Sequence, residues 1–341
     1  MTVESVAEKN GLQPGGALVS RPAVLKFLTM ENLAQWLLGF WRGFGIPSVS
    51  IGVFLLLWAQ LSSTIVTSLG ALPGPVQVYE EAYGLWTDHQ AQAEQKEAFY
   101  ARQEERNAKL LASDPGARPV FRQYTGKPTY LDQIFTSLKT VFMGFFLATV
   151  VAVPLGIICG LSKTANAALN PVIQTFRPVS PLAWLPIVTM VVSALYVTET
   201  PMFQKSFLIS AVTVSLCSLW PTLINTSVGV ASIDKELLNV GKVLRLKWST
   251  QLVRLVLPSA LPFIFTGMRL SLGVGWMVLI AAEMLAQNPG LGKFVWDEFQ
   301  NGSSHSLGRI MVAVFTIGII GFLLDRMMGM AQSLVTFDGR K

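Results

Sequence analysis

The sequence has little charge for its length. Of its 341 residues only 13% are Asp, Glu, Lys or Arg, whereas 51% are hydrophobic, and the mean hydropathy is +0.49. A soluble domain usually carries about 25% charged residues, so this chain cannot cover a globule of its size with charge. The charges are also clustered, which leaves long apolar runs between them. The composition excludes a water-soluble globular fold and indicates a helical membrane protein.

Cysteine and histidine are too few and too scattered for the sites that they usually build. Cys159 and Cys217 lie within apolar runs, where small packing residues are expected rather than a disulfide or a metal site. His89 and His305 are far apart in polar segments, and no cluster has metal-ligand spacing. The sequence also lacks the basic and aromatic strip of a nucleic-acid-binding protein. We therefore predict no metal, no cofactor and no nucleic acid bound to this chain.

Motifs for catalysis are missing as well. The chain has no Gly-x-x-x-x-Gly-Lys-Ser/Thr phosphate loop. It shows no paired acids, His cluster or Ser-Lys set of the kind that a membrane-embedded enzyme would need. The N-terminal segment is mixed polar and has no early apolar core, so we expect no signal peptide. These absences predict a membrane protein that is not an enzyme.

Six apolar spans are present, each close to or above the roughly 20 residues that cross the hydrocarbon. They cover residues 49–69, 136–161, 169–197, 207–230, 261–286 and 310–334. Pro178, Pro181 and Pro186 interrupt the third span and predict a bent or broken helix there. Glycines in spans two and five are expected to permit close helix contact, at Gly144, Gly156, Gly160, Gly267, Gly273 and Gly275. The predicted fold class is an all-α membrane protein of about six transmembrane helices.

The distribution of basic residues predicts the orientation. The loop between spans four and five carries five basic residues, Lys235, Lys242, Arg245, Lys247 and Arg254. By the positive-inside rule this side is cytoplasmic, and six spans place both termini there. Residues 1–45 are predicted as a cytoplasmic tail followed by an amphipathic helix at 24–44, either in the interface or against the bundle. Residues 46–69 hold the first span, and 129–338 form a five-helix core.

Residues 70–128 form one large insertion on the opposite side. Acidic and basic residues alternate at three- and four-residue offsets, which favours a solvated helix that ends at Asp114-Pro115-Gly116. This insertion could cover the first span, meet an external partner, or be a solvated decoration.

A short amphipathic helix is predicted in the cytoplasmic loop at 233–248, with a second helix beginning near Ser249 or Thr250. Leu237, Val240, Val243 and Leu244 form its apolar face. A short, exposed, partly apolar helix suits docking into a groove on another protein.

This loop resembles the cytoplasmic signature of binding-protein-dependent ABC permeases, Glu-Ala-Ala, three residues, Gly, nine residues, Ile, one residue, Leu-Pro. Leu257-Pro258 and Gly241 fit it, whereas Asn239 stands at the acid and Arg245 at the central glycine. At these positions the sequence is similar to that of permeases for nitrate and nitrite and of their cyanate and bicarbonate relatives. The similar stretch consists of Asn239, Val240, Gly241, Lys242, Val243, Leu244, Arg245 and Leu246. The runs at 177–186 and 267–292 resemble nitrate, sulfonate and taurine permeases.

The resemblance covers residues 131–338 and implies the type I ABC importer permease fold in a bacterial inner membrane. It implies a second permease subunit, here a homodimer, and two cytoplasmic ATPases that bind ATP and magnesium. It also implies a periplasmic or lipid-anchored binding protein that delivers the solute. The residues 239–246 would couple to the ATPases. The expected cargo is nitrate, with nitrite or cyanate close to it and bicarbonate or a sulfonate such as taurine as alternatives.

Charged and polar residues inside the spans are candidates for the translocation pathway, because intramembrane charge is costly and usually functional. The candidates are Lys139, Gln174, Arg177, Ser180, Trp184, Arg269, Trp276 and Glu283. An excess of cations would favour a small anion. Structural roles are the alternative: pairing or anchoring for Arg269 and Glu283, and carbonyl capping for Arg177. An ATP-independent channel or secondary transporter is the other reading, although the inverted repeats typical of many secondary transporters are not evident.

Overall fold

The computed structural model describes residues 38–39, 41–67, 70–114, 118–197, 202–303 and 305–335. Most of these residues are helical, residues 118–129 have no regular structure, and two short strands, β1 (Val66–Thr67) and β2 (Gly70–Ala71), form a hairpin. The chain divides into two compact units, Met1–Leu61 and Ser62–Lys341. Residues 1–37 lie outside the described residues, and so does most of the amphipathic helix predicted at 24–44.

The described part of the first unit consists mainly of helix α3 (Ile46–Thr64), whose last turn lies beyond Leu61, and α3 follows a π-helical turn, η3 (Trp41–Gly45). The two together are long and apolar enough to cross a membrane. The first span was predicted to reach residue 69, but the helix ends at Thr64. It ends early because Val66 pairs with Ala71 in the β1–β2 hairpin, which turns the chain back.

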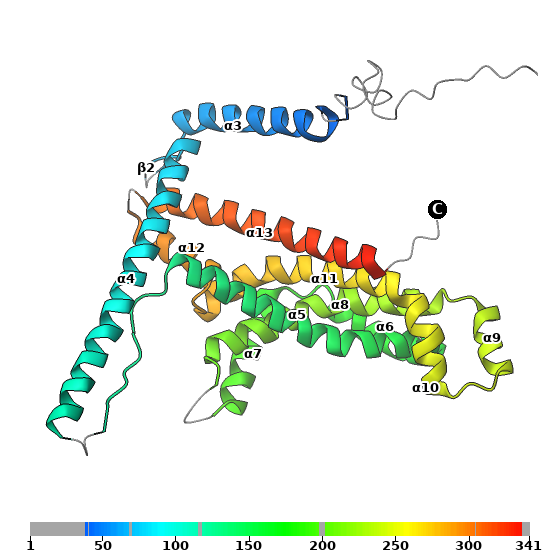
Figure 1. Ribbon diagram of the computed structural model, residues 1–341. Helices are drawn as coiled ribbons and strands as arrows, with labels where there is room; N and C mark the ends of the chain where they lie inside the picture. Colours follow the sequence, from blue (N-terminus) through cyan, green and yellow to red (C-terminus); the bar gives the residue numbers. More distant parts are fainter. Residues whose placement is uncertain are drawn as a thin grey trace, which may run out of the picture. The chain divides into compact units, whose positions relative to one another are not determined.

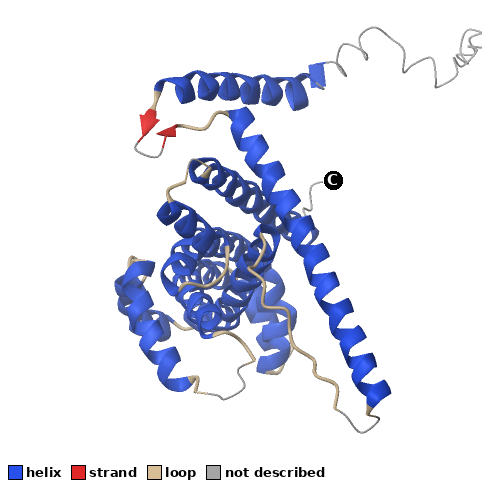
Figure 2. Ribbon diagram, turned by 90° about the vertical axis from the view of Figure 1, so that its left-hand side faces the viewer, coloured by secondary structure: helices blue, strands red, loops and turns tan. Residues whose placement is uncertain are grey.

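The insertion forms one long helix, α4 (Pro75–Ser113). Gly74 precedes it, Pro75 occupies its first turn, and the Gln77 side chain accepts a hydrogen bond from the Gly74 N–H at 3.1 Å. A segment without regular structure returns along the helix, and the Asn107 amide bonds both backbone groups of Val120. The helix predicted in this insertion is confirmed, and Figures 1 and 2 show it crossing the ends of α5 (Tyr130–Leu161) and α13 (Ser306–Val335).

Three helices form the centre of the second unit: α5 (Tyr130–Leu161), α8 (Lys205–Ala231) and α11 (Leu257–Ala286). Helix α8 packs against both of the others, and α13 (Ser306–Val335) lies along α11. Val141, Val214, Leu272 and Leu279 fill the core between them. With α3, these helices account for five candidate spans.

The third predicted span is the remaining candidate, and it is broken into two helices. Helices α6 (Lys163–Phe176) and α7 (Pro181–Leu195) meet at an angle of 103°. Proline restricts the residue before it and cannot continue a hydrogen-bonded helix, so the Pro178–Pro181 corner separates the two helices. The bend predicted for this segment is confirmed.

Glycine allows close approach at most of the predicted positions. A Cβ at Gly144 would lie 2.7 Å from the Ala211 carbonyl oxygen, and one at Gly160 would lie 2.5 Å from Val230 Cβ, so α5 packs directly on α8. Gly156 and Gly267 are similarly crowded, with the nearest atoms 2.6 and 2.9 Å from such a Cβ, whereas at Gly275 the nearest atom, Val214 Cγ1, would lie 3.3 Å away. The prediction was wrong for Gly273, where a Cβ would have no atom of another helix within 4 Å among the described residues.

Candidate functional site

The loop between α8 and α11 contains the short helix that the sequence predicted. Helix α9 (Lys235–Val243) begins after Asp234, whose side chain accepts the Glu236 N–H at 2.9 Å. It ends at Val243 rather than at Trp248, where the next helix, α10 (Trp248–Gln251), begins. Leu238 packs towards the core beside Val256, whereas Val240, Val243 and Leu244 are exposed. The helix therefore presents an apolar surface that nothing covers within the described part of the chain.

The end of α9 has the hydrogen bonding of a Schellman cap. Arg245 has a φ of 47°, and the Leu246 N–H donates to the Gly241 carbonyl at 3.0 Å. This left-handed position usually holds glycine, because a Cβ there is sterically costly. Arg245 is the residue that stands at the central glycine of the permease signature, so the backbone keeps a conformation that favours glycine.

Gly241 fixes α9 against the segment that leads into α11. That segment includes a π-helical turn, η4 (Leu252–Val256). A Cβ at Gly241 would lie 2.9 Å from Leu255 Cδ1, so a large side chain cannot be accommodated there without displacing η4. Local π-helical turns often occur at functional sites. Gly241 and Leu255 thus connect the exposed helix to the longest candidate span, Trp248–Ala286.

Four of the predicted pathway residues lie around the α6–α7 corner. Arg177 ends α6 and is exposed, and Ser180 begins α7 by accepting the Leu182 N–H at 3.3 Å. Among the described residues no carbonyl accepts from the Arg177 guanidinium, so the structure gives no support to a capping role. Trp184 packs on Phe176, with ring centroids 5.6 Å apart. Gln174 bonds Asn170 at 3.4 Å.

Lys139 lies apart from this corner. It is exposed on α5 in an apolar groove that also contains Phe203 and Phe207, whose rings stack at 5.4 Å. The other residues that line the groove are Phe135, Leu138, Phe142, Met143 and Phe146. None of the corner residues lines it, so the structure does not bring Lys139 together with Arg177.

Arg269 pairs with a residue that the sequence reasoning missed. Its Nε and Nη2 atoms donate to the two carboxylate oxygens of Asp325, both at 2.6 Å, and join α11 to α13. The pair faces a groove that also holds Gln332, whose side chain bonds Thr266 at 3.0 Å. A single acid within the apolar run of span six was the signal that could have identified Asp325.

Glu283 is fully buried in a hydrogen-bond network. The Ser137 hydroxyl donates to its carboxylate at 2.8 and 2.9 Å, and the Gly292 N–H donates at 3.0 Å. Ser137 also accepts the Leu291 N–H at 2.9 Å. Helix α12 (Leu291–Asn301), which the sequence reasoning did not predict, is thereby fixed to α5 and α11. Trp276 is buried too, and its Nε1 donates to the Ile317 carbonyl at 3.0 Å. For Arg269, Glu283 and Trp276 the contacts are those of helix packing.

A cluster of charges, here called the α4 anchor, attaches α4 to the first turns of α13. It consists of Glu81, Asp88, Glu298, His305 and Arg309. Glu81 contacts His305 at 2.5 Å and Arg309 at 3.4 Å, and Arg309 also reaches Asp88 at 3.6 Å and Glu298 at 3.5 Å. The α4 anchor fixes the first third of the insertion at the ends of the spans.

The fold is found in solved ABC importers. Two inward-facing structures of the MetNI methionine ABC transporter are similar, with TM-scores of 0.51 and 0.53 and identities of 15% and 13%. They cover 61% and 60% of this chain and 96% and 95% of theirs. The architecture is therefore that of a type I ABC importer permease.

Sequence comparison defines the family. Residues 152–336 match the family of binding-protein-dependent transport system inner membrane components, and the chain belongs to that family. It is 34% identical to the nitrate import permease protein NrtB of Synechocystis sp., over 85% of this chain and 88% of the relative. It is also 34% identical to the bicarbonate transport system permease protein CmpB of Synechocystis sp., over 87% and 91%. The chain is an ABC importer permease of the nitrate and bicarbonate group, whose ATPase is a partner subunit.

Proposed function

We propose that this permease moves nitrate from the outside of a bacterial inner membrane to the cytoplasm by alternating access. The similarity to NrtB over most of both chains carries the proposal. Nitrite and cyanate are small monovalent anions of similar size and would be the nearest competitors. Bicarbonate is the second candidate, favoured by the equal identity to CmpB. Sulfonates such as taurine come third.

The assembly follows from the family. Two copies of this chain would form the pathway, two ATPases would bind ATP and magnesium, and a binding protein outside would deliver the anion. The basic loop around α9 supports a cytoplasmic position for that loop and for both termini. Helix α4 then lies outside.

Helix α9 is the proposed contact with the ATPase. The exposed apolar residues Val240, Val243 and Leu244 would enter a groove on that subunit, as short amphipathic helices do. Gly241 and the turn at Arg245 would hold α9 at a constant angle to η4. Movement of the ATPase would thereby reach α11 directly.

The proposed pathway is lined by residues of the α6–α7 corner and by Lys139 in its groove on α5. At the α6–α7 corner Gln174, Arg177 and Ser180 are exposed and Trp184 is half-buried, and Lys139 is exposed on α5. Two cations that no carboxylate neutralises within the described residues would lower the barrier for an anion. Arg269, Trp276 and Glu283 would hold the walls of the pathway in place.

The test is nitrate uptake into proteoliposomes that contain this chain, its ATPases and its binding protein, with and without ATP. Nitrite, cyanate, bicarbonate, sulfate and taurine serve as competitors. Uptake that requires ATP and is blocked by unlabelled nitrate or nitrite supports the proposal. ATP-dependent uptake of bicarbonate or taurine alone would show that nitrate is not the cargo, although the family would stand. Solute movement without ATP would indicate a channel or a secondary transporter.

A further inference from the structure

Helix α4 carries a stripe of large side chains that face away from the rest of the second unit. The stripe consists of Val76, Tyr79, Tyr83 and Trp86, whose exposed fractions lie between 50% and 72%. Their spacing of three, four and three residues places them within an arc of about 80° on the helix. The buried residues Val78 and Leu85 lie on the other side of α4. The stripe is therefore a separate face that the rest of the unit leaves open.

The position of this face follows from what holds α4. The α4 anchor ties Glu81 and Asp88 to the first turns of α13, and His89 Nδ1 lies 2.8 Å from the hydroxyl of Thr129, which caps α5. Helix α4 crosses the ends of the spans rather than running along them (Figures 1 and 2). If α5 and α13 cross the membrane, as their length and composition allow, residues 76–89 would lie near the level where these helices leave the hydrocarbon.

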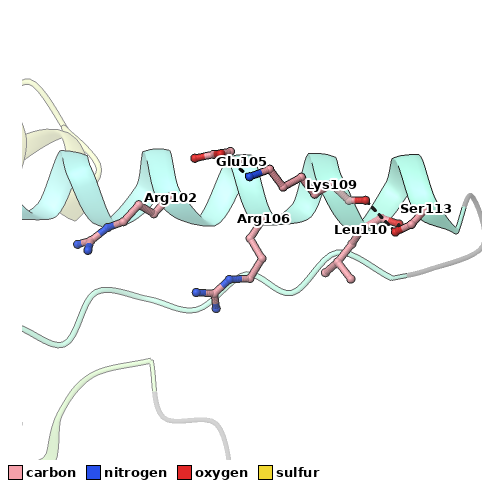
Figure 3. Close-up of a pocket in the computed structure, with 6 residues that line it drawn as sticks. All are labelled: Arg102, Glu105, Arg106, Lys109, Leu110 and Ser113. Carbon is pink, nitrogen blue, oxygen red and sulfur yellow. Dashed lines mark hydrogen bonds and ion pairs between the residues drawn. The ribbon is translucent and has the colours of Figure 1, made fainter.

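The composition of α4 changes beyond this level. The stripe contains one tryptophan and two tyrosines, and no lysine or arginine occurs between residues 75 and 95. Farther along, the helix carries mixed charge, and Figure 3 shows Lys109 paired with Glu105, with Arg102 and Arg106 on the preceding turns. Those residues are solvated, whereas an exposed Tyr–Tyr–Trp face matches the aromatic belt that forms at headgroup level.

We propose that residues 76–86 of α4 lie in the headgroup region of the outer leaflet, with the stripe inserted towards the acyl chains. Because Glu81 and Asp88 hold α4 beside the first turns of α13, the stripe would lie close to the outer boundary of the hydrocarbon. The insertion would then be held on one side by the α4 anchor and on the other by lipid. The inference rests on the proposed orientation of the chain but not on the identity of the anion.

Nitroxide accessibility tests this proposal in the full chain in lipid nanodiscs. The background is Cys159→Ala with Cys217→Ala, labelled at Tyr83→Cys and, as a matched control on the same helix, at Glu104→Cys. We expect the Tyr83→Cys label to collide with oxygen and to be protected from a water-soluble nickel chelate, and the Glu104→Cys label to show the reverse. Nickel access at both sites would place the stripe in water and favour a protein partner. Protection from both reagents at Tyr83→Cys would mean that protein covers it. Either result overturns the proposal.

A second measurement avoids the cysteine background. Bromine on lipids quenches the fluorescence of nearby tryptophans. In nanodiscs with lipids brominated near the headgroup, we expect a smaller quenched fraction of tryptophan emission in Trp86→Phe than in the unmodified chain. An equal quenched fraction in Trp86→Phe and the unmodified chain would overturn the proposal. Nitrate uptake is measured separately, so failure here leaves the proposed function untouched.

Discussion

Arg269 and Asp325 join α11 to α13 through two parallel hydrogen bonds, each 2.6 Å long. This two-point geometry is the strongest arrangement open to a guanidinium and a carboxylate. An apolar neighbour cannot replace either partner, because the other would stay charged among apolar helices.

We therefore expect Asp325→Ala and Arg269→Ala each to lower the yield of folded, monodisperse protein. The exchange Arg269→Asp with Asp325→Arg should recover a clear part of it. Size-exclusion profiles and thermal unfolding in detergent measure this. An exchanged variant as poor as the single variants would show that the pair is not what stabilises this contact.

Gly241 should tolerate a methyl group better than a ring. A Cβ there meets the end of the flexible Leu255 side chain, so Gly241→Ala can be accommodated by a small shift. Gly241→Trp must displace α9 from η4. We predict that Gly241→Trp retains assembly but loses coupling, so that ATP hydrolysis continues with little uptake. Full uptake in that variant, with a normal ATPase complex, would contradict the role given to α9.

Substitutions at Arg245 can distinguish the effect of its left-handed backbone conformation on stability from the effect of its charge. Arg245→Gly should stabilise the chain by about 1 kcal/mol, because the φ of 47° suits glycine. Arg245→Ala loses the same charge without that gain and is the matched control. Chemical or thermal unfolding of the two variants measures the difference. Arg245→Glu reverses the charge at the proposed ATPase contact and should uncouple hydrolysis from uptake.

Ser137 and Ser210 form a matched pair for testing the Glu283 network. Both are fully buried, but Ser137 bonds Glu283 and Leu291, whereas the Ser210 hydroxyl has no partner in the described ranges. Ser137→Ala leaves buried groups unsatisfied and should cost about 1–3 kcal/mol. Ser210→Ala should cost little. Similar losses in the two variants would argue against a structural role for the network.

Lys139 and Arg177 carry the proposed anion preference. Lys139→Ala and Arg177→Ala should each reduce nitrate uptake at normal expression, and Lys139→Arg and Arg177→Lys, which keep the charge, should retain more of it. Transport assays in proteoliposomes, with the ATPase rate as a control for assembly, measure this. Unchanged uptake in both alanine variants would end the pathway assignment.

Much of the fold was predictable from local patterns. Apolar length identified the spans, the proline run located the α6–α7 corner, and alternating charge indicated α4. Helix α12 was not predicted because it is short and amphipathic, and it is fixed by Leu291 and Gly292 bonding to residues distant in sequence. The mean hydropathy of a short stretch of sequence cannot detect such contacts.

The candidate site was predictable only in part. The motif around Gly241 identified α9, since its residues are contiguous in the chain. Charge inside a span identified Arg269 and Glu283 but not their partners, because Asp325 and Ser137 come from other helices. Residue type alone could not distinguish a charged residue that stabilises helix packing from one that contacts the solute.

The charge balance of the α4 anchor bears on how anions arrive. Three carboxylates, those of Glu81, Asp88 and Glu298, surround the one guanidinium of Arg309. With His305 neutral the anchor carries net negative charge, and if this surface is the outer one, as proposed, its field would deflect a small anion within roughly a Debye length of about 8 Å at physiological salt. We expect free anions to be excluded from this side, so that handover by the binding protein occurs elsewhere on the outer face.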